Sequence, residues 1–364
     1  MTVIVVGAGV IGCAIAYELA VRGAAVVVLD ARGLGQGATR ASAGILAPYI
    51  EGHSSALLRL GICSLDRYDA FVRRVAADSE RAIEYRRTGT LQVARTDEEA
   101  RQLARQQQAL AGLGTRADVV DGGEARRLEP ALAQDIRGAL RVQAHGYVRA
   151  GVLTEALAAA ARARGARMSV VRVERVRAAG DGVAVTTADG DITADAVVLA
   201  AGSWSGDIVM APLPPAPVRP VRGQLVELRL PQPPVAHIVW GTDCYLVPWK
   251  DGRVLVGATV EDVGFDERVT VGGVRQLLES AAQLVPALGG AAFEGARAGL
   301  RPATSDELPI IGASTTMRGV FYATGHYRNG VLLAPLTASL VADLLLDGHA
   351  RPELNLVRPD RFGL

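Results

Sequence analysis

The chain has 364 residues, of which 49% are hydrophobic and 21% are charged, and its formal net charge is +1. This length predicts two domains, or one large domain with an inserted lobe, and the composition is typical of soluble globular proteins. The near-neutral charge gives no reason to expect nucleic acid or an anionic membrane as a partner. The three cysteines lie far apart in sequence, so we predict neither a disulfide framework nor a metal site.

The first thirty residues predict a dinucleotide-binding unit. A short apolar strand runs into the glycines Gly7, Gly9 and Gly12, a helix follows over residues 13–21, and a second buried strand ends at Asp30. The glycines allow a tight turn, close approach of a pyrophosphate and close packing of helix on strand, and the helix N-terminus favours phosphate charge. Asp30 lies where an acid accepts hydrogen bonds from a ribose. The alternative is a glycine-rich turn in an ordinary α/β domain.

The cellular compartment is predicted from the position of the first strand and from the lengths of the apolar runs. The first strand begins at residue 2, so we expect no signal peptide. Outside the α/β pattern, no uninterrupted apolar run is long enough to span a membrane. We therefore expect a cytoplasmic protein in a reducing compartment.

The rest of the chain predicts further helices and strands. Residues 31–50 predict a loop of small residues beside the nucleotide site, and residues 151–202 read as helix, strand, hairpin and strand. Since this second series continues the first unit, we expect a nucleotide domain that is split in sequence. The other predicted elements are helices at 54–85 and 97–111, strands at 91–94, 137–142 and 168–173, a proline-rich crossover at 212–220, strands at 223–230, 244–248 and 253–259, a helix at 271–284, a closing helix at 332–347 and a loose tail at 351–364.

Five motifs together resemble the FAD-dependent amine oxidases, a family that includes D-amino acid oxidase, sarcosine oxidase and glycine oxidase. The resemblance covers essentially the whole chain. Its last two motifs look most like the bacterial glycine oxidases, which supply glycine imine for the thiazole ring of thiamine. The motifs are residues 5–12, 37–44, 197–202, 299–302 with 309–312, and 325–335.

This resemblance implies a fold of two domains. One is an α/β, Rossmann-type FAD-binding domain, and the other is an α+β substrate-binding domain with a mixed sheet. We expect the FAD-binding domain to comprise residues 1–85, 146–215 and 301–364. The substrate-binding domain then takes residues 86–145 and 216–300.

The resemblance also implies which residues bind FAD. Sarcosine oxidases attach their flavin to a cysteine in the region of Arg301, and no cysteine follows Cys244 here, so we predict noncovalent FAD. The N-terminus of the last helix can stabilise negative charge on the reduced flavin. By match of position the cofactor-binding residues are Gly7, Gly9, Val10, Ile11, Gly12, Asp30, Ala31, Thr39, Ala43, Gly44, Ile45, Val173, Gly202, His326, Tyr327, Arg328, Asn329, Gly330, Val331 and Leu332.

Three residues match the family's substrate-contacting positions. Arg301 matches an arginine that binds a carboxylate, Tyr245 a tyrosine that adds a hydrogen bond to it, and Arg328 a second arginine near the flavin. The alternatives are a surface ion pair for Arg301, simple packing on a strand for Tyr245, and a lid latch for Arg328. For His326 we favour a helix-capping or flavin-edge role over proton abstraction. We expect Asp243, which lies near this pocket in sequence, to point to solvent.

The function implied is oxidation of glycine or a similar small amino acid or amine. Hydride transfer from Cα to flavin N5 gives an imine, which is hydrolysed to a 2-oxo acid and ammonia, and O₂ is the expected acceptor, giving H₂O₂. The open alternatives are a D-amino acid oxidase, a dehydrogenase with another electron acceptor, and a flavin-binding protein without activity. We expect a homo-oligomer, and we hypothesise that the loop at residues 50–60 gates the site.

Overall fold

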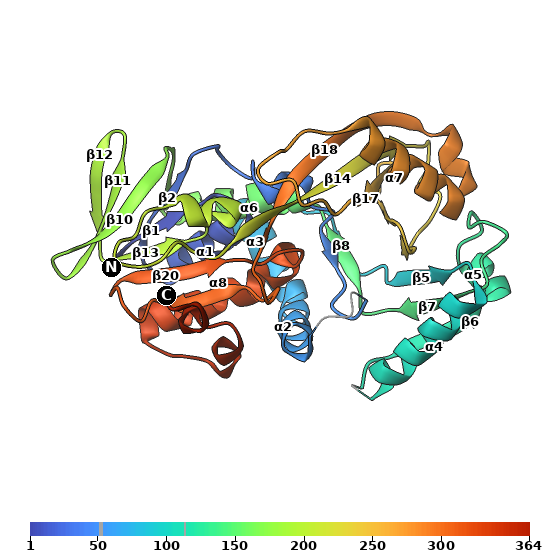
Figure 1. Cartoon of the computed structure of the whole chain (residues 1–364), viewed down its shortest axis with the longest axis horizontal. Coiled ribbons are helices and arrows are strands. Elements are labelled where there is room, and N and C mark those ends of the chain that lie inside the picture. Colours follow the sequence, from blue (N-terminus) through green and yellow to red (C-terminus); the bar gives the residue numbers. More distant parts are fainter. Residues whose placement is uncertain (51–53, 113) are drawn as a thin grey trace.

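The protein is described here by a computed structural model, which covers residues 1–50, 54–112 and 114–364. Two lobes lie side by side along the long axis of the molecule (Figure 1). Each lobe is built around its own large sheet. Residues 51–53 of the hypothesised gating loop lie outside the described part of the chain.

The first lobe contains a six-stranded sheet assembled from three separate parts of the chain. Five of its strands pair in parallel, and only β19 runs antiparallel to its neighbour. The predicted nucleotide domain split in sequence is therefore confirmed. In spatial order the strands are β19 (Ile310–Ala313), β20 (Val320–Thr324), β13 (Ala196–Leu199), β1 (Thr2–Val6), β2 (Ala25–Asp30) and β9 (Arg167–Val170).

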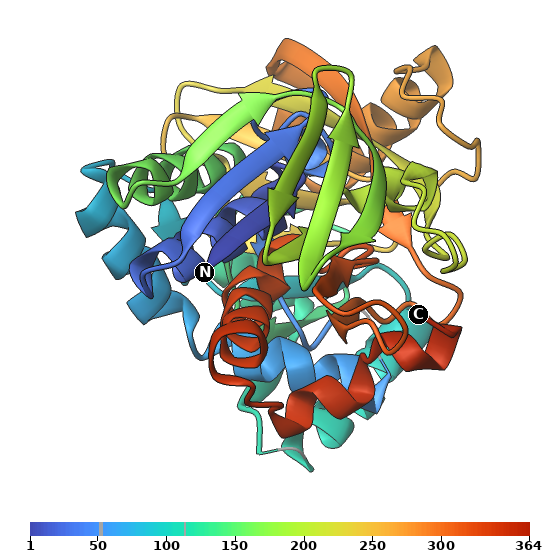
Figure 2. The same ribbon diagram turned by 90° about the vertical axis from the view of Figure 1, so that its left-hand side faces the viewer.

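The two faces of this sheet are covered differently. Alternate strand residues such as Val3 and Val5 face helices, whereas Ile4 and Val6 face a smaller antiparallel sheet. Figure 2 shows this smaller sheet, in light green, in front of the blue strands of the large one. The covering helices are α1 (Val10–Val21), α2 (Ser55–Leu65), α3 (Tyr68–Ser79), α6 (Ala150–Ala163) and α8 (Gly330–Asp347), and the smaller sheet comprises β10 (Val173–Ala179), β11 (Gly182–Thr187) and β12 (Gly190–Ala194).

Helix α8 is long and apolar enough to cross a membrane, but it belongs to the core of this lobe. Of its 18 residues, 67% are buried inside the fold. Its side chains pack with those of α1 and of the six-stranded sheet. Its apolar character is thus explained by packing, as expected for a buried helix.

The second lobe contains a mixed eight-stranded sheet. Helices α5 (Gly122–Leu128) and α7 (Val271–Leu284) pack on one face, and α4 (Asp97–Ala111) packs on the other. A small sheet of β3 (Ile45–Leu46), β8 (Gly146–Val148) and β4 (Tyr85–Arg86) lies near the junction of the lobes. In spatial order the eight strands are β18 (Ala292–Ala303), β14 (Arg219–Arg229), β17 (Arg253–Gly257), β16 (Tyr245–Pro248), β15 (Ile238–Trp240), β5 (Thr90–Ala94), β7 (Gly138–Val142) and β6 (Ala117–Asp121).

Several predicted elements differ from the structure. The single helix predicted at 54–85 is wrong, because the chain turns at residues 66–67 between α2 and α3 and then enters β4. The predicted strand at 168–173 divides between β9 and β10, which join different sheets. The loop predicted at 31–50 contains a short 3₁₀ helix, η1 (Ala38–Ala41), and strand β3.

The C-terminal tail is packed rather than loose. It forms the 3₁₀ helices η4 (Pro352–Leu356) and η5 (Pro359–Phe362), and Val357 and Leu364 are fully buried. The hydroxyl of Thr315 donates a hydrogen bond to the Leu364 carbonyl at 2.9 Å. The prediction failed because a few anchoring side chains, rather than a regular apolar pattern, hold this segment. Two further 3₁₀ helices occur, η2 (Gly202–Asp207) and η3 (Pro286–Gly290).

Candidate functional site

A cavity of about 450 Å³ is lined by residues of both lobes. It starts at the glycine turn between β1 and α1 and reaches β16, β17 and β18 of the eight-stranded sheet. All the predicted cofactor-binding and substrate-contacting residues line it, with the exception of Gly12. The structure thus brings together predicted site residues that are far apart in the sequence.

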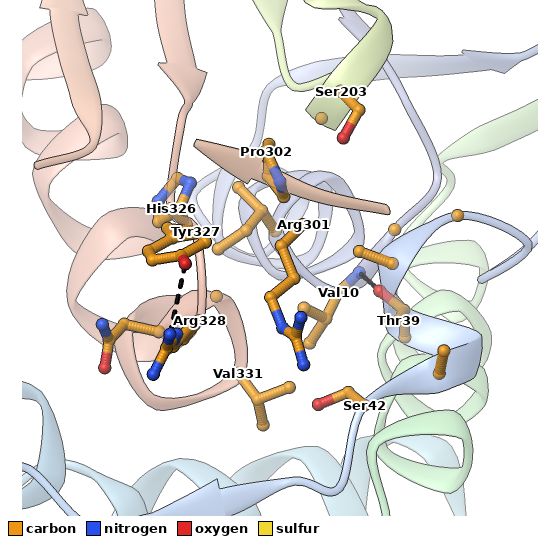
Figure 3. Close-up of a pocket in the computed structure, with 18 of the residues that line it drawn as sticks. Val10, Thr39, Ser42, Ser203, Arg301, Pro302, His326, Tyr327, Arg328 and Val331 are labelled. Carbon is orange, nitrogen blue, oxygen red and sulfur yellow. Dashed lines mark hydrogen bonds between the residues drawn. The ribbon is translucent and has the colours of Figure 1, made fainter. Parts of the chain in front are cut away.

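Gly12 has a packing role at the edge of this cavity. A Cβ atom at this position would lie 1.9 Å from the carbonyl oxygen of Gly7, so only glycine allows α1 to start this close to the turn. The helix begins at Val10, and its N-cap residue is Gly9, which has no side chain to cap it. The Val10 N–H donates a hydrogen bond to the Thr39 hydroxyl at 3.0 Å (Figure 3). The α1 N-terminus and Thr39 therefore meet at the cavity wall, where the positive end of the helix favours a phosphate.

Asp30 is held firmly at the end of β2. Its carboxylate accepts hydrogen bonds from the backbone N–H groups of Ala8 at 2.7 Å, Arg32 at 2.7 Å and Gly33 at 2.8 Å. A carboxylate can accept about four hydrogen bonds, so capacity is left for one more donor such as a ribose hydroxyl.

Gly44 marks the close approach of the small-residue loop to the cavity. Its φ is +69°, and a Cβ atom would lie 1.8 Å from the carbonyl oxygen of Val148. Only glycine can hold the chain here, with Ala43 and Ile45 against the cavity on either side. The shape of the wall thus fits a bound ligand that runs along this backbone.

The turn before α8 closes the cavity from the first lobe. Tyr327 has a φ of +47°, and its N–H donates a hydrogen bond to the Pro302 carbonyl at 2.8 Å, which ties this turn to the end of β18. Helix α8 has no side-chain cap at its N-terminus. Its positive end therefore fits negative charge in the cavity.

His326, at the start of this turn, is buried and neutral. Burial lowers its pKa to about 3. Its Nε2 atom shares a hydrogen bond of 3.0 Å with the Thr337 hydroxyl, two turns inside α8. A ring with so low a pKa is a weak base, and its Nε2 atom is already bonded to α8, which favours a structural role at the cavity wall over proton abstraction.

Arg301 is fixed at the cavity wall by two backbone carbonyls. Its Nη1 atom donates to the backbone carbonyls of Arg222 at 3.2 Å and Thr259 at 3.0 Å. The guanidinium lies over Gly223, where a Cβ atom would come within 2.2 Å of Nη2. Figure 3 shows this side chain pointing into the cavity, between the turn that carries Arg328 and the segment that carries Thr39 and Ser42. It forms no ion pair with a described residue, so the surface ion pair considered as an alternative is not found in the described chain.

Tyr245 and Arg328 lie on opposite lobes and line the same cavity. The Tyr245 ring lies over Gly257, where a Cβ atom would come within 2.5 Å of its hydroxyl oxygen, and it leans on Trp240 with 5.0 Å between ring centroids. Arg328 donates a hydrogen bond to the Tyr327 hydroxyl at 3.3 Å and lies over that ring (Figure 3). With Arg301, these side chains offer two guanidinium groups and one phenol to a ligand.

Some lining residues were not predicted from the sequence. Arg32 and Trp204 line the end near Asp30, and Trp240 lines the end near Tyr245. Asp243 is exposed, as expected, but it also lines the cavity and a second one of about 300 Å³ behind it. Trp204 follows the glycine motif at 197–202 by two residues, which was the only sequence signal available.

The chain matches the FAD dependent oxidoreductase family over residues 2–344. It belongs to this family. The match covers both lobes and all the residues discussed above, so the cofactor is FAD. The glycine turn after β1, the N-termini of α1 and α8, and Asp30 all lie along this cavity and fit this ligand.

Several relatives share most of the chain. Glycine oxidase of Geobacillus kaustophilus is 38% identical over 94% of this chain and 92% of its own length. Its crystal structure matches with a TM-score of 0.92, covering 96% of this chain and 95% of that one. Iminodiacetate oxidase from Chelativorans sp. matches with a TM-score of 0.87 at 28% identity, over 98% of both chains. The bifunctional protein ThiO/ThiG of Synechocystis sp. is 35% identical over 99% of this chain, which spans 54% of its length.

Proposed function

We propose that this protein is an FAD-dependent oxidase of glycine or a similar small amino acid or amine. The observation that carries the proposal is Arg301, whose guanidinium enters the cavity opposite the α8 turn and is held by two backbone carbonyls. A planar, fixed guanidinium suits a carboxylate. The relatives named glycine oxidase support the same substrate class.

The residues act mainly by binding and orientation. Arg301 would bind the substrate carboxylate, with Tyr245 and Arg328 adding polar contacts, and Ile45 and Val260 would leave room for a small substrate only. FAD, when bound, supplies the acceptor for the hydride that leaves Cα. Since burial lowers the pKa of His326 to about 3 and its Nε2 atom is bonded to Thr337, the ring is a weak base and we assign it no proton transfer. The imine is then released and hydrolysed to a 2-oxo acid and ammonia.

The proposal has several further parts. We propose O₂ as the acceptor, with H₂O₂ as a product, noncovalent FAD, a cytoplasmic location, a homo-oligomeric state and the domain boundaries given above. The boundary predicted at residue 300 falls inside strand β18 (Ala292–Ala303) of the second lobe, so we propose to place this boundary after the strand. The relative named ThiO/ThiG supports a place in thiamine biosynthesis.

The test is anaerobic reduction of the bound flavin by a panel of amines. We expect glycine and sarcosine to bleach the flavin absorbance, and D-alanine and D-proline to do so more slowly. Bleaching only by the bulkier D-amino acids would instead support a D-amino acid oxidase. No bleaching by any of the four, with FAD bound, would contradict the proposed activity.

A further inference from the structure

The segment that connects β17 to α7, residues 259–270, is anchored firmly on the eight-stranded sheet. Beneath it lies Arg222, which is 4% exposed. The Arg222 guanidinium pairs with Glu261 at 2.6 Å and with Asp266 at 3.0 Å. At the far end of the segment, the Thr270 N–H donates to the Gln224 side chain at 2.7 Å. Because these contacts fix the segment near both of its ends, the residues between them have a defined position on the sheet.

The middle of this segment reaches across to the first lobe. Phe265 lies against Trp204 with 6.0 Å between ring centroids. Glu267 pairs with Arg32 at 2.9 Å. Arg32 in turn lies over the Trp204 ring, with its guanidinium carbon 4.6 Å from the ring centroid. Four side chains from both lobes thus form one cluster, in which the cation–π contact and the ion pair share Arg32.

This cluster lies at one end of the cavity. Arg32 and Trp204 line the cavity next to Asp30, whereas Phe265 and Glu267 stand behind them. The acid that ends the second strand of a dinucleotide-binding unit marks the ribose of the nucleotide. The cavity wall made by Arg32 and Trp204 therefore faces the adenosine half of FAD. Their flat guanidinium and indole groups suit a nucleoside.

One atom of the cluster lacks a partner. Glu267 Oε1 is buried and accepts no hydrogen bond from a described residue. A buried oxygen without a donor costs free energy, so such an atom is uncommon unless a ligand or water completes the arrangement. The Glu267 carboxylate pairs with Arg32, which lines the cavity, whereas Glu267 itself lies behind it.

We propose that residues 259–270 form a clasp that retains FAD by its adenosine half. In this clasp, Phe265 and Glu267 of the second lobe hold Trp204 and Arg32 of the first lobe against the nucleoside. Phe265 and Glu267 are positioning residues, because they act through Trp204 and Arg32. The inference depends on the FAD site and not on which amine is oxidised.

The test measures the rate at which FAD leaves the protein. Wild type and the variants Glu267→Gln and Phe265→Ala are loaded with FAD, diluted, and separated from released flavin at intervals. Each variant should release FAD about two- to fivefold faster than wild type, as expected for the loss of one partly exposed ion pair or ring contact. The matched controls are Glu294→Gln, which removes the Arg229–Glu294 pair of the same lobe away from the cavity, and Val263→Ala within the segment. Both should match wild type.

A second comparison separates retention from general loosening of the fold. In an Arg32→Ala background, Glu267→Gln should cause no further acceleration, because Glu267 acts through Arg32. The apoproteins of wild type and Glu267→Gln should unfold at the same temperature. Wild-type release rates in both clasp variants, or an undiminished effect of Glu267→Gln without Arg32, would overturn the proposal.

Discussion

The Arg301 guanidinium is fixed in the cavity by contacts within the protein itself. Two of its N–H groups are used by the carbonyls of Arg222 and Thr259, and the guanidinium lies where Gly223 leaves space for it. Little side-chain entropy is left to lose when a carboxylate binds, which favours affinity. His326 is an opposite case, because burial removes its charge and leaves it a structural partner of Thr337.

The pKa of His326 makes a prediction for stability. It falls to about 3 in the folded chain, against about 6.5 in the unfolded chain. Between these values the unfolded chain binds the proton and the folded chain does not, so the free energy of unfolding should decrease as the pH falls below 6.5. The loss from this group should reach roughly 2 kcal/mol at pH 5.

Urea unfolding of the apoprotein at pH 7.5 and pH 5 measures this effect. In His326→Gln, whose amide can still bond to Thr337, the difference between the two pH values should shrink by about 2 kcal/mol relative to wild type. His349→Gln is the control, since His349 is exposed. An unchanged pH dependence in His326→Gln would mean that this histidine does not stay neutral when folded.

At the scale of elements, the segment 259–270 contacts residues that line both ends of the cavity. Its first residue, Thr259, holds Arg301, and its middle contacts the lobe that carries Arg32. Glu261 connects the two functions, because it binds the buried Arg222, whose own carbonyl also holds Arg301. A change at Glu261 should therefore affect the position of Arg301 at the substrate end of the cavity more than the contacts of Arg32 at the other end.

Glu261→Gln should weaken substrate binding. Loss of this charge leaves Arg222 with Asp266 as its ion-pair partner, so the backbone that holds Arg301 is less firmly fixed. We expect KM for the amino acid to rise about five- to tenfold with a smaller change in kcat, a difference of about 1 kcal/mol in binding. Steady-state kinetics at saturating FAD gives both values. The control is Asp262→Asn, whose pair with Arg219 is exposed. A fall in kcat of about five- to tenfold with an unchanged KM would contradict this account.

Element prediction from the sequence succeeded where local signals are strong. The helices at 97–111 and 271–284 were predicted to the residue, and Thr96 and Thr270 cap their N-termini. The helix predicted at 54–85 failed because Asp66 and Arg67, at its break, are compatible with a helix. Only the packing of Leu65 and Tyr68 against the core of the first lobe decides that the chain turns there.

At the scale of the whole molecule, the cavity exists because distant segments meet between two sheets. Arg301, Tyr245 and Arg328, which were predicted from the resemblance to the family, all line this cavity. The cluster of Arg32, Trp204, Phe265 and Glu267 could not be identified in this way. Its members come from three separate segments, and only the position of one lobe against the other brings them together.

The same geometry bears on how the cofactor is attached. Cys244 lines the cavity, but burial raises the pKa of its thiol to about 12, so the reactive thiolate is disfavoured. We therefore predict that acid precipitation releases all of the yellow flavin into the supernatant. Flavin that stays with the pellet, and is released from a Cys244→Ala variant, would show a covalent bond instead.

The central claim is that Arg301 binds the carboxylate of the substrate. Anaerobic flavin reduction by glycine in Arg301→Ala and in the matched control Arg297→Ala tests it most directly. Arg297 lies on the same strand and pairs with Glu227, and it does not line the cavity. We predict that Arg301→Ala keeps FAD and needs at least about a hundredfold more glycine for the same rate, as for loss of a bidentate charged contact. Arg297→Ala should behave as wild type. Equal glycine dependence in wild type and Arg301→Ala would contradict the account.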